Sequence, residues 1–101
     1  MKNNTYHFFF RNLANPIRIK IISSLKEKEK SVGELSEELK IEQSKLSHAL
    51  KSLKCCNIVN VKQKGKHRIY SLNKKTIIPI LKIIDSHSRA FCKGECRGCG
   101  R

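Results

Sequence analysis

The sequence ends in three closely spaced cysteines whose thiols could hold one soft metal ion. Cys92, Cys96 and Cys99 form a C-x3-C-x2-C pattern, and two glycines between them allow the backbone to curl around an ion. Thiolates favour zinc, copper(I), arsenic(III) or an iron–sulfur cluster. Arsenic(III) needs only three thiolates, whereas zinc requires a fourth ligand, which His87 or a second chain could supply. We expect a thiophilic metal or metalloid site in this tail; the alternative is a tail whose thiols bind nothing.

Cys55 and Cys56 are the other two cysteines. Adjacent side chains point about 100° apart on a helix, so both seldom bind one ion. Cysteine packs well as a small apolar residue, and we therefore expect this pair to lie in the core. The alternative is a ligand role at the end of a helix.

The net charge of the 101-residue chain is +14, from 22 lysines and arginines against eight aspartates and glutamates. So large a charge on one small domain indicates a polyanion as the partner. The alternative is a solvated lysine-rich surface, and the placement of the charges distinguishes the two. The chain has no paired carboxylates, no nucleophile–base set and a single aspartate, so we expect no enzyme activity.

Neither a membrane span nor a secretion signal is indicated by the sequence. No apolar run approaches the roughly 20 residues that cross a bilayer. Residues 1–10 lack the apolar core and cleavage site of a signal peptide. We therefore expect a cytoplasmic protein without membrane contact, whose thiols stay reduced.

Helical periodicity and capping residues predict four helices before residue 56. Aromatic residues crowd 6–13, and Asn15-Pro16 then supplies an N-cap and a first helical residue. A polar linker, KEKEK at 26–30, precedes a capping box at Ser31 and Glu34 that opens a short third helix. The fourth helix is expected at about 43–55, with an i, i+3, i+4, i+7 apolar stripe formed by Leu46, Ala49, Leu50 and Leu53.

The hydrophobic period changes after residue 57. Two strand-like segments, 58–61 and 68–72, flank a basic turn with Gly65 at its tip, which predicts a hairpin. A last helix begins near Thr76 and is apolar on more than one face, so we expect a partner chain to cover part of it. The predicted fold is mainly α with a minor β part: a winged helix-turn-helix of about five helices and one hairpin over 1–91, followed by the tail at 92–101.

The outward face of the fourth helix is predicted to read DNA. It carries hydroxyls and cations with no acid after Glu42, whereas the third helix mixes acids and bases. Short hydroxyls allow a close approach to the major groove, and lysines reach phosphates or guanine edges. The expected contacts are Gln43, Ser44, Lys45, Ser47, His48, Lys51 and Ser52.

The hairpin repeats this signal without a single carboxylate. A basic two-stranded tip suits the phosphates that flank the groove. Alternatively, lysines on an exposed strand prevent edge-to-edge aggregation. The expected phosphate contacts are Lys62, Lys64, Lys66, His67 and Arg68.

Four segments, in this order, resemble the ArsR family of winged-helix transcriptional repressors, which includes the metal-sensing SmtB-type proteins. They are NLANPIR at 12–18, QSKLSHAL at 43–50, LKCCNIV at 53–59 and QKGKHRIY at 63–70. They resemble the entry to the second helix, the recognition helix, its exit and the wing. The departures are Ala49 for a common histidine, Cys56-Asn57 for Ala-Gly, and Gln63 and Lys66 for two arginines.

The resemblance implies a homodimer, joined through the first and last helices, that binds a double-stranded operator with dyad symmetry and represses transcription. The arsenic sensors' third-helix thiol motif has no counterpart at 32–39. Asp85 and His87 match only the first half of the family's last-helix zinc site, so they are candidate ligands or a solvent-facing helix end. We expect metal or metalloid binding to cysteine thiolates to modulate the DNA binding, and no further protein partner. The alternative is a non-regulatory nucleic-acid or chromatin-binding module without a ligand response.

Overall fold

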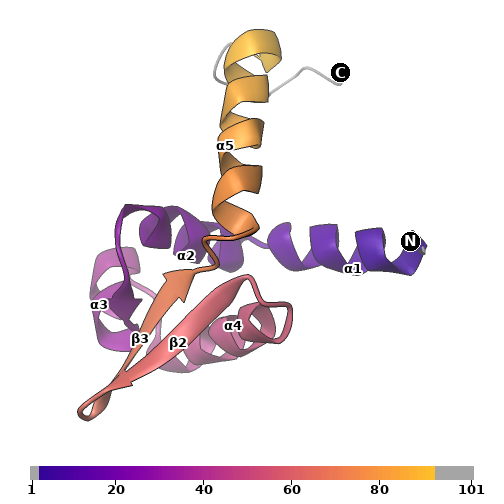
Figure 1. Cartoon of the computed structure of the whole chain (residues 1–101). Coiled ribbons are helices and arrows are strands. Elements are labelled where there is room, and N and C mark those ends of the chain that lie inside the picture. The colour runs from indigo at the N-terminus through magenta and orange to yellow at the C-terminus, as the bar shows by residue number, and fades with distance from the viewer. Residues whose placement is uncertain (1–2, 93–101) are drawn as a thin grey trace.

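The computed structural model describes residues 3–92, which form five α-helices and a three-stranded antiparallel sheet (Figure 1). The helices are α1 (Asn3–Leu13), α2 (Pro16–Glu27), α3 (Val32–Leu39), α4 (Gln43–Cys55) and α5 (Ile77–His87), which continues as a π-helix, η1 (Ser88–Cys92). The strands are β1 (Lys30–Ser31), β2 (Val59–Lys64) and β3 (His67–Leu72). The predicted order of four helices, a hairpin and a last helix is confirmed, and so is the mainly α winged helix-turn-helix fold.

Side-chain caps start α2 and α3 where the sequence predicts. Asn15 Oδ1 accepts hydrogen bonds from the backbone N–H groups of Ile17 (3.0 Å) and Arg18 (3.3 Å). Ser31 Oγ accepts one from the N–H of Glu34 (3.2 Å), and Glu34 Oε1 accepts one from the N–H of Ser31 (2.9 Å). This bond from the Ser31 amide keeps the pKa of Glu34 below its ordinary value. Because each cap satisfies N–H groups that a helix start leaves unpaired, local sequence determines where both helices begin.

The core lies where α4 packs against α2, α3 and the sheet. Leu46, Leu50 and Leu53 are completely buried and Ala49 nearly so, which confirms the predicted stripe. The remaining buried apolar residues are Ile21, Ile22, Leu25, Leu35, Ile58, Val59, Tyr70, Leu72 and Ile77. Burying a leucine contributes about 1.5–3 kcal/mol. The stripe therefore fixes the rotation of α4 about its own axis and turns its polar face to solvent.

The strand β1 is a feature that the sequence does not predict. Lys30 and Ser31 pair with Tyr70 and Ile69 of β3, which gives the sheet the order β1-β3-β2. Two residues are too few for an alternating pattern, and their pairing partner lies far along the chain. The expected polar linker is thus partly a strand, which ties the entry of α3 to the wing.

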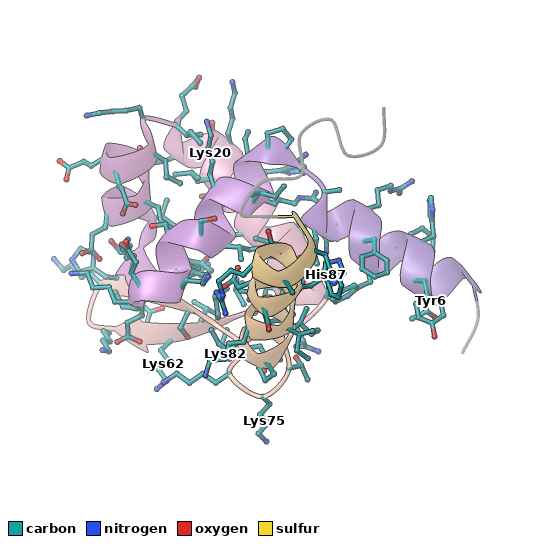
Figure 2. The ribbon with its side chains drawn as sticks, turned by 90° about the horizontal axis from the view of Figure 1, so that it is seen from above. Tyr6, Lys20, Lys62, Lys75, Lys82 and His87 are labelled. Carbon is teal, nitrogen blue, oxygen red and sulfur yellow. The ribbon has the colours of Figure 1, made fainter. Side chains whose placement is uncertain are left out.

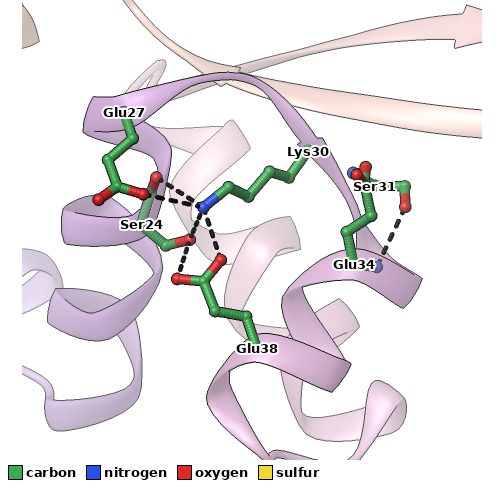
Figure 3. A network of polar contacts seen from close by, with 6 residues as sticks. All are labelled: Ser24, Glu27, Lys30, Ser31, Glu34 and Glu38. Atoms are coloured by element: carbon green, nitrogen blue, oxygen red, sulfur yellow. Dashed lines mark hydrogen bonds and ion pairs between the residues drawn. The ribbon is translucent and has the colours of Figure 1, made fainter.

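The side chain of Lys30 is buried, contrary to the expectation of a solvated linker. It is 4% exposed, and its Nζ donates hydrogen bonds to Ser24 Oγ (2.6 Å), the Ser24 carbonyl (3.1 Å) and Glu38 Oε1 (2.6 Å) (Figure 3). Glu27 lies 3.5 Å away. The hydrogen bond to Glu38 raises the pKa of Lys30, and the same bond lowers the pKa of Glu38. A buried ammonium needs such partners, so this network joins α2, β1 and α3.

The hairpin presents two different faces. β2 and β3 pair from Val59 with Leu72 to Lys64 with His67, and Gly65 turns the chain at φ +61°, a conformation that favours glycine. Side chains alternate along each strand. The face toward α4, which we call the inner face, carries Val61, Gln63, Arg68 and Tyr70, whereas the outer face carries Asn60, Lys62, Lys64 and Ser71.

Both terminal helices extend beyond the core and expose apolar surface. Figure 1 shows α5 rising from the body of the molecule and α1 extending to one side. On α1, Tyr6, Phe8 and Phe10 are each more than half exposed, and on α5 and η1, Ile83 (69%) and Phe91 (74%) are more so. The predicted surplus of apolar surface on the first and last helices is therefore present. None of the helices within residues 3–92 is long and apolar enough to cross a membrane.

The ion pair between Lys30 and Glu38 predicts a specific pH dependence of stability. Because the pKa of Glu38 is lowered in the folded protein, its contribution is complete above the ordinary value of 4.5 and is lost as the pH falls through the lowered value. We expect Glu38→Gln to lower the free energy of unfolding in urea at pH 7, and the difference from the wild type to shrink as the pH falls through the lowered pKa. Glu37→Gln, which removes an exposed carboxylate without a hydrogen bond among residues 3–92, is the control. Equal stability of both variants at pH 7 would contradict this account.

Candidate nucleic-acid interface

The exposed face of α4 carries most of the side chains predicted to read DNA. Gln43, Ser44, Lys45, Ser47, His48 and Lys51 are all exposed, and so is Lys54. They lie opposite the buried leucine stripe, as the helical period requires. Ser52 differs from the others, because it is half-buried on the side that faces α1 and its carbonyl accepts a hydrogen bond from Asn12 Nδ2 (3.4 Å).

A groove of about 610 Å³ joins α4 to the inner face of the hairpin. Ser47, Lys51 and Lys54 line it from the helix, and Gln63 and Arg68 line it from the strands. Leu50, Val61 and Tyr70 form its floor. The fold thus brings the two predicted basic elements to opposite walls of one groove.

The predicted wing cations do not all lie on that side. Arg68 is on the inner face, whereas Lys62 and Lys64 are on the outer face. Lys64 Nζ also donates to Glu29 Oε1 at 3.1 Å, which neutralises part of its charge. Lys66, His67 and Arg68 border a hollow of about 370 Å³ beside the start of α3 and Gln43. The alternation of side chains along a strand assigns these faces, but only when the register of the hairpin is also known.

Among the described residues, none that line the groove between α4 and the hairpin carries a carboxylate. Within residues 3–92, Lys45, Lys51, Lys54 and Arg68 have no carboxylate within 4.0 Å. By contrast, Glu38 of α3 is turned toward α2, where it binds Lys30. The positive charges of the groove are therefore available to a polyanion.

Arg18 is a residue near this surface whose role the residue pattern did not indicate. Its guanidinium donates to the Asn12 carbonyl at 3.3 Å and to the Asn12 side-chain oxygen. Asn12 is 7% exposed and also reaches the carbonyl of Ser52. This chain of hydrogen bonds links α1, α2 and α4, so Arg18 and Asn12 position the recognition helix against the first helix.

The expectation that Cys55 and Cys56 pack in the core is wrong, since both thiols are free and exposed. Cys55 ends α4 outside its leucine stripe, and Cys56 follows as the C-cap. Asn57 then takes a positive φ of 57°, which turns the chain so that Ile58 fills the core instead. Both cysteines border a hollow of about 470 Å³ that Phe8 and Arg11 of α1 also line.

The described residues do not assemble a metal site. Asp85 Oδ2 accepts a hydrogen bond from Lys26 Nζ at 2.9 Å, and the exposed ring of His87 packs on Phe91 at 4.9 Å between centroids. Within residues 3–92, no three His, Cys, Asp or Glu side chains lie close enough to share an ion. Cys92 is the last described residue, and Cys96 and Cys99 lie outside the described part of the chain.

Comparisons with known proteins agree with this geometry. The family model of the bacterial regulatory proteins of the arsR family matches residues 15–61. The uncharacterized HTH-type transcriptional regulator Rv0081 of Mycobacterium tuberculosis is 38% identical over 76 residues, 74% of this chain and 67% of that protein. Its crystal structure superimposes with a TM-score of 0.80 at 30% identity, covering 91% of this chain and 92% of that one.

Two further matches concern repression and assembly in other proteins. A transcriptional repressor SmtB homolog of Synechocystis is 29% identical over 79 residues, 78% of this chain and 60% of that protein. The homodimeric winged helix-turn-helix DNA-binding domain Mb0332 of Mycobacterium bovis has a TM-score of 0.81 over 91% of this chain and 85% of that one. At 16% identity, this second match supports the fold alone.

The exposure of Cys55 and Cys56 predicts rapid reaction with a thiol reagent. In a variant with Cys92, Cys96 and Cys99 changed to Ser, we expect Ellman's reagent to titrate two thiols in the native protein, because both side chains are solvent-accessible. A further Cys56→Ser change should leave one reactive thiol. Reaction only after denaturant is added would show that the thiols are packed.

Proposed function

Because the chain belongs to the ArsR family of bacterial transcriptional regulators, we propose that it binds operator DNA as a homodimer and represses transcription. The family and the relatives are regulators and not enzymes, and this chain is a transcriptional regulator with a winged helix-turn-helix fold. The proposal adds which residues contact DNA, how two chains assemble and what signal releases them.

The observation that carries the DNA-binding mode is the groove between α4 and the inner face of the hairpin. Its two walls hold Lys51, Lys54 and Arg68, and none of the three has a carboxylate within 4.0 Å in the part of the chain that the structure describes. In winged helix-turn-helix proteins the recognition helix enters the major groove. When α4 lies in the major groove of the DNA, the hairpin lies over the adjacent phosphates. Arg68 and Lys66 then neutralise these phosphates.

The exposed face of α4 supplies donors and acceptors suited to base edges. Gln43 and the lysines can bind adenine and guanine edges respectively, and Ser44 and Ser47 can bind either. His48 lies on the same exposed face. Ser52 is half-buried, so it contributes less to the contact with DNA. Short serine side chains also let the helix backbone approach the DNA closely.

Assembly into a homodimer through α1 and α5 is supported by their exposed apolar residues. Tyr6, Phe8, Phe10, Ile83, Ile84 and Phe91 are all at least half exposed. Large exposed apolar side chains gathered on the two terminal helices are typical of an interaction site. A two-fold dimer would set two recognition helices roughly 34–36 Å apart, one helical turn of DNA, and thus match an operator with dyad symmetry. Occupancy of such an operator obstructs transcription, which is the basis of the proposed repression.

Metal or metalloid control remains part of the proposal through the cysteines. The resemblance to a family that includes the metal-sensing SmtB-type proteins supports this part, and a transcriptional repressor SmtB homolog is among the relatives. The chemistry of Cys92, Cys96 and Cys99 suits a thiophilic ion, and the exposed Cys55 and Cys56 at the end of α4 are accessible as further ligands. Asp85 is less suitable, since Lys26 already binds its carboxylate.

Single substitutions separate the roles of the basic residues. We expect Lys51→Ala to weaken operator binding by about 1–3 kcal/mol, measured by fluorescence anisotropy, because it removes a contact between α4 and the major groove of the DNA. Lys66→Ala should reduce the slope of log affinity against log salt by about 1, whereas Lys64→Ala should change it less because Glu29 already pairs with Lys64. Lys20→Ala, on the exposed side of α2, is the control. Equal effects at Lys64, Lys66 and Lys20 would contradict this assignment.

Metal control is tested with protein purified without oxygen. We expect a bound thiophilic metal by elemental analysis, and a change in operator affinity when that metal is removed and restored. The change of Cys92, Cys96 and Cys99 to Ser should abolish both the stoichiometric metal and the response. A response that persists in this triple variant would remove the tail from the proposal, and a Cys55→Ser, Cys56→Ser variant then tests the other thiols.

A further inference from the structure

A second concave surface lies where the hairpin meets the end of α2 and the segment that leads into α5. The end of α2, residues 60–62 of β2, residues 71–72 of β3 and the segment that leads into α5 line a cleft of about 820 Å³, which we call the outer cleft. Figure 2 shows Lys62 and Lys75 on this side of the molecule, near Lys82 of α5, with Lys20 on the opposite side. The volume falls within the roughly 300–1,000 Å³ of small-molecule sites.

The floor of the outer cleft is apolar. Leu25 and Leu72 are nearly buried and Ile78 is half-buried, and Val61, an inner-face residue, lines both this cleft and the groove beside α4. An apolar floor with a few polar groups at its rim is the usual construction of a small-molecule site. Contact with DNA phosphates does not require such a floor.

The rim of the outer cleft carries an uncompensated positive charge. Its five lysines are Lys26, Lys28, Lys62, Lys74 and Lys75, and its two acids are Glu27 and Glu29. Each acid already has a lysine partner outside the cleft, since Glu27 lies 3.5 Å from Lys30 and Glu29 lies 3.1 Å from Lys64. Lys26 is paired with Asp85. Within residues 3–92, the other four rim lysines have no carboxylate within 4.0 Å.

The DNA-binding surface does not account for these lysines. Lys62 projects from the outer face, whereas Arg68 and Gln63 line the groove on the inner face. A duplex that lies against α4 and the inner face leaves the outer face of the hairpin turned to solvent. The rim lysines are therefore free to bind another anion while α4 occupies the major groove.

The outer cleft also adjoins a junction between the wing and α5. Asn73 follows β3, and its side-chain oxygen accepts hydrogen bonds from the backbone N–H groups of Lys75 (2.9 Å) and Thr76 (3.3 Å). Its Nδ2 donates to the carbonyl of Asn57 at 2.8 Å, directly after α4. A ligand held by Lys74 and Lys75 would therefore act on the segment that sets α5 relative to the wing and the end of α4.

We propose that the outer cleft binds a small organic anion, a carboxylate, phosphate or sulfonate with an apolar body, and that its binding changes the affinity for DNA. The apolar floor takes the body, and Lys28, Lys62, Lys74 and Lys75 take the charge. The regulatory part of this inference rests on the proposed function, whereas the binding part does not.

The binding part is tested with anilinonaphthalenesulfonate, an anionic probe that fluoresces on apolar protein surface. The full-length protein should bind it saturably, and Lys75→Glu should weaken the binding about tenfold, since it reverses a charge beside the sulfonate. Lys20→Glu, an equal reversal on the far side, should change it less than about twofold. Lys62→Glu provides an independent rim variant, with circular dichroism verifying that each variant folds. Equal effects of Lys75→Glu and Lys20→Glu, or full competition by methanesulfonate, which lacks the apolar body, would overturn the site.

The regulatory part is tested by measuring operator affinity with and without saturating probe. We expect a change within roughly 5- to 150-fold, the usual range of coupling between two sites, and its loss in Lys75→Glu. Probe binding at the outer cleft without any change in operator affinity would overturn the coupling. Failure of the wild type to bind any operator specifically would instead refute the proposed function, and the probe titration would still decide the site.

Discussion

Burial of Leu46, Leu50 and Leu53 determines which face the recognition helix presents to solvent. Each of these side chains is completely buried, and each contributes about 1.5–3 kcal/mol by leaving water. A rotation of α4 that exposed them would also bury lysines without partners, which costs several kcal/mol more. The same constraint that closes the core thus holds Lys45 and Lys51 outward, so the stability of the core and the proposed contacts with DNA depend on one helical period.

The basic residues of this protein serve three different purposes. Lys30 is buried and links α2, β1 and α3 through Ser24 and Glu38, which holds the helix-turn-helix against the sheet. Lys64 is bound at the surface by a single acid. Two further cations of the hairpin lie on its opposite faces, where Arg68 faces α4 and Lys62 lines the outer cleft. The basic residues of the described part of the chain are therefore spread over separate surfaces.

The sequence predicts the features that depend on local chemistry. The caps at Asn15 and Ser31 and the stripe of α4 follow from hydrogen bonding within a few residues and from the helical period, and the structure confirms them. Features that depend on residues far apart in the sequence are not predicted in this way. β1 exists because β3 lies beside it, and Lys30 is buried because Glu38 and Ser24 meet it there. Neither partner can be read from a charged linker.

The candidate site shows the same division. The exposed face of α4 follows from periodicity, but the outward position of Lys62 requires the register of the hairpin. Cys55 and Cys56 were expected in the core because cysteine is usually buried; the turn at Asn57, which the sequence does not mark with glycine, places Ile58 there instead. Residue preferences thus predict which elements form, whereas the faces and turns depend on packing between them.

The central claim is that two copies of α4 read adjacent major grooves of one operator. It is tested most directly by selecting a binding sequence from random duplexes and mapping it with hydroxyl-radical footprinting and guanine N7 methylation interference. The account predicts a dyad-symmetric sequence with two protected segments about 10–10.5 base pairs apart, and loss of binding when major-groove N7 atoms within them are methylated. A single protected segment without symmetry, or binding insensitive to N7 methylation, would contradict it.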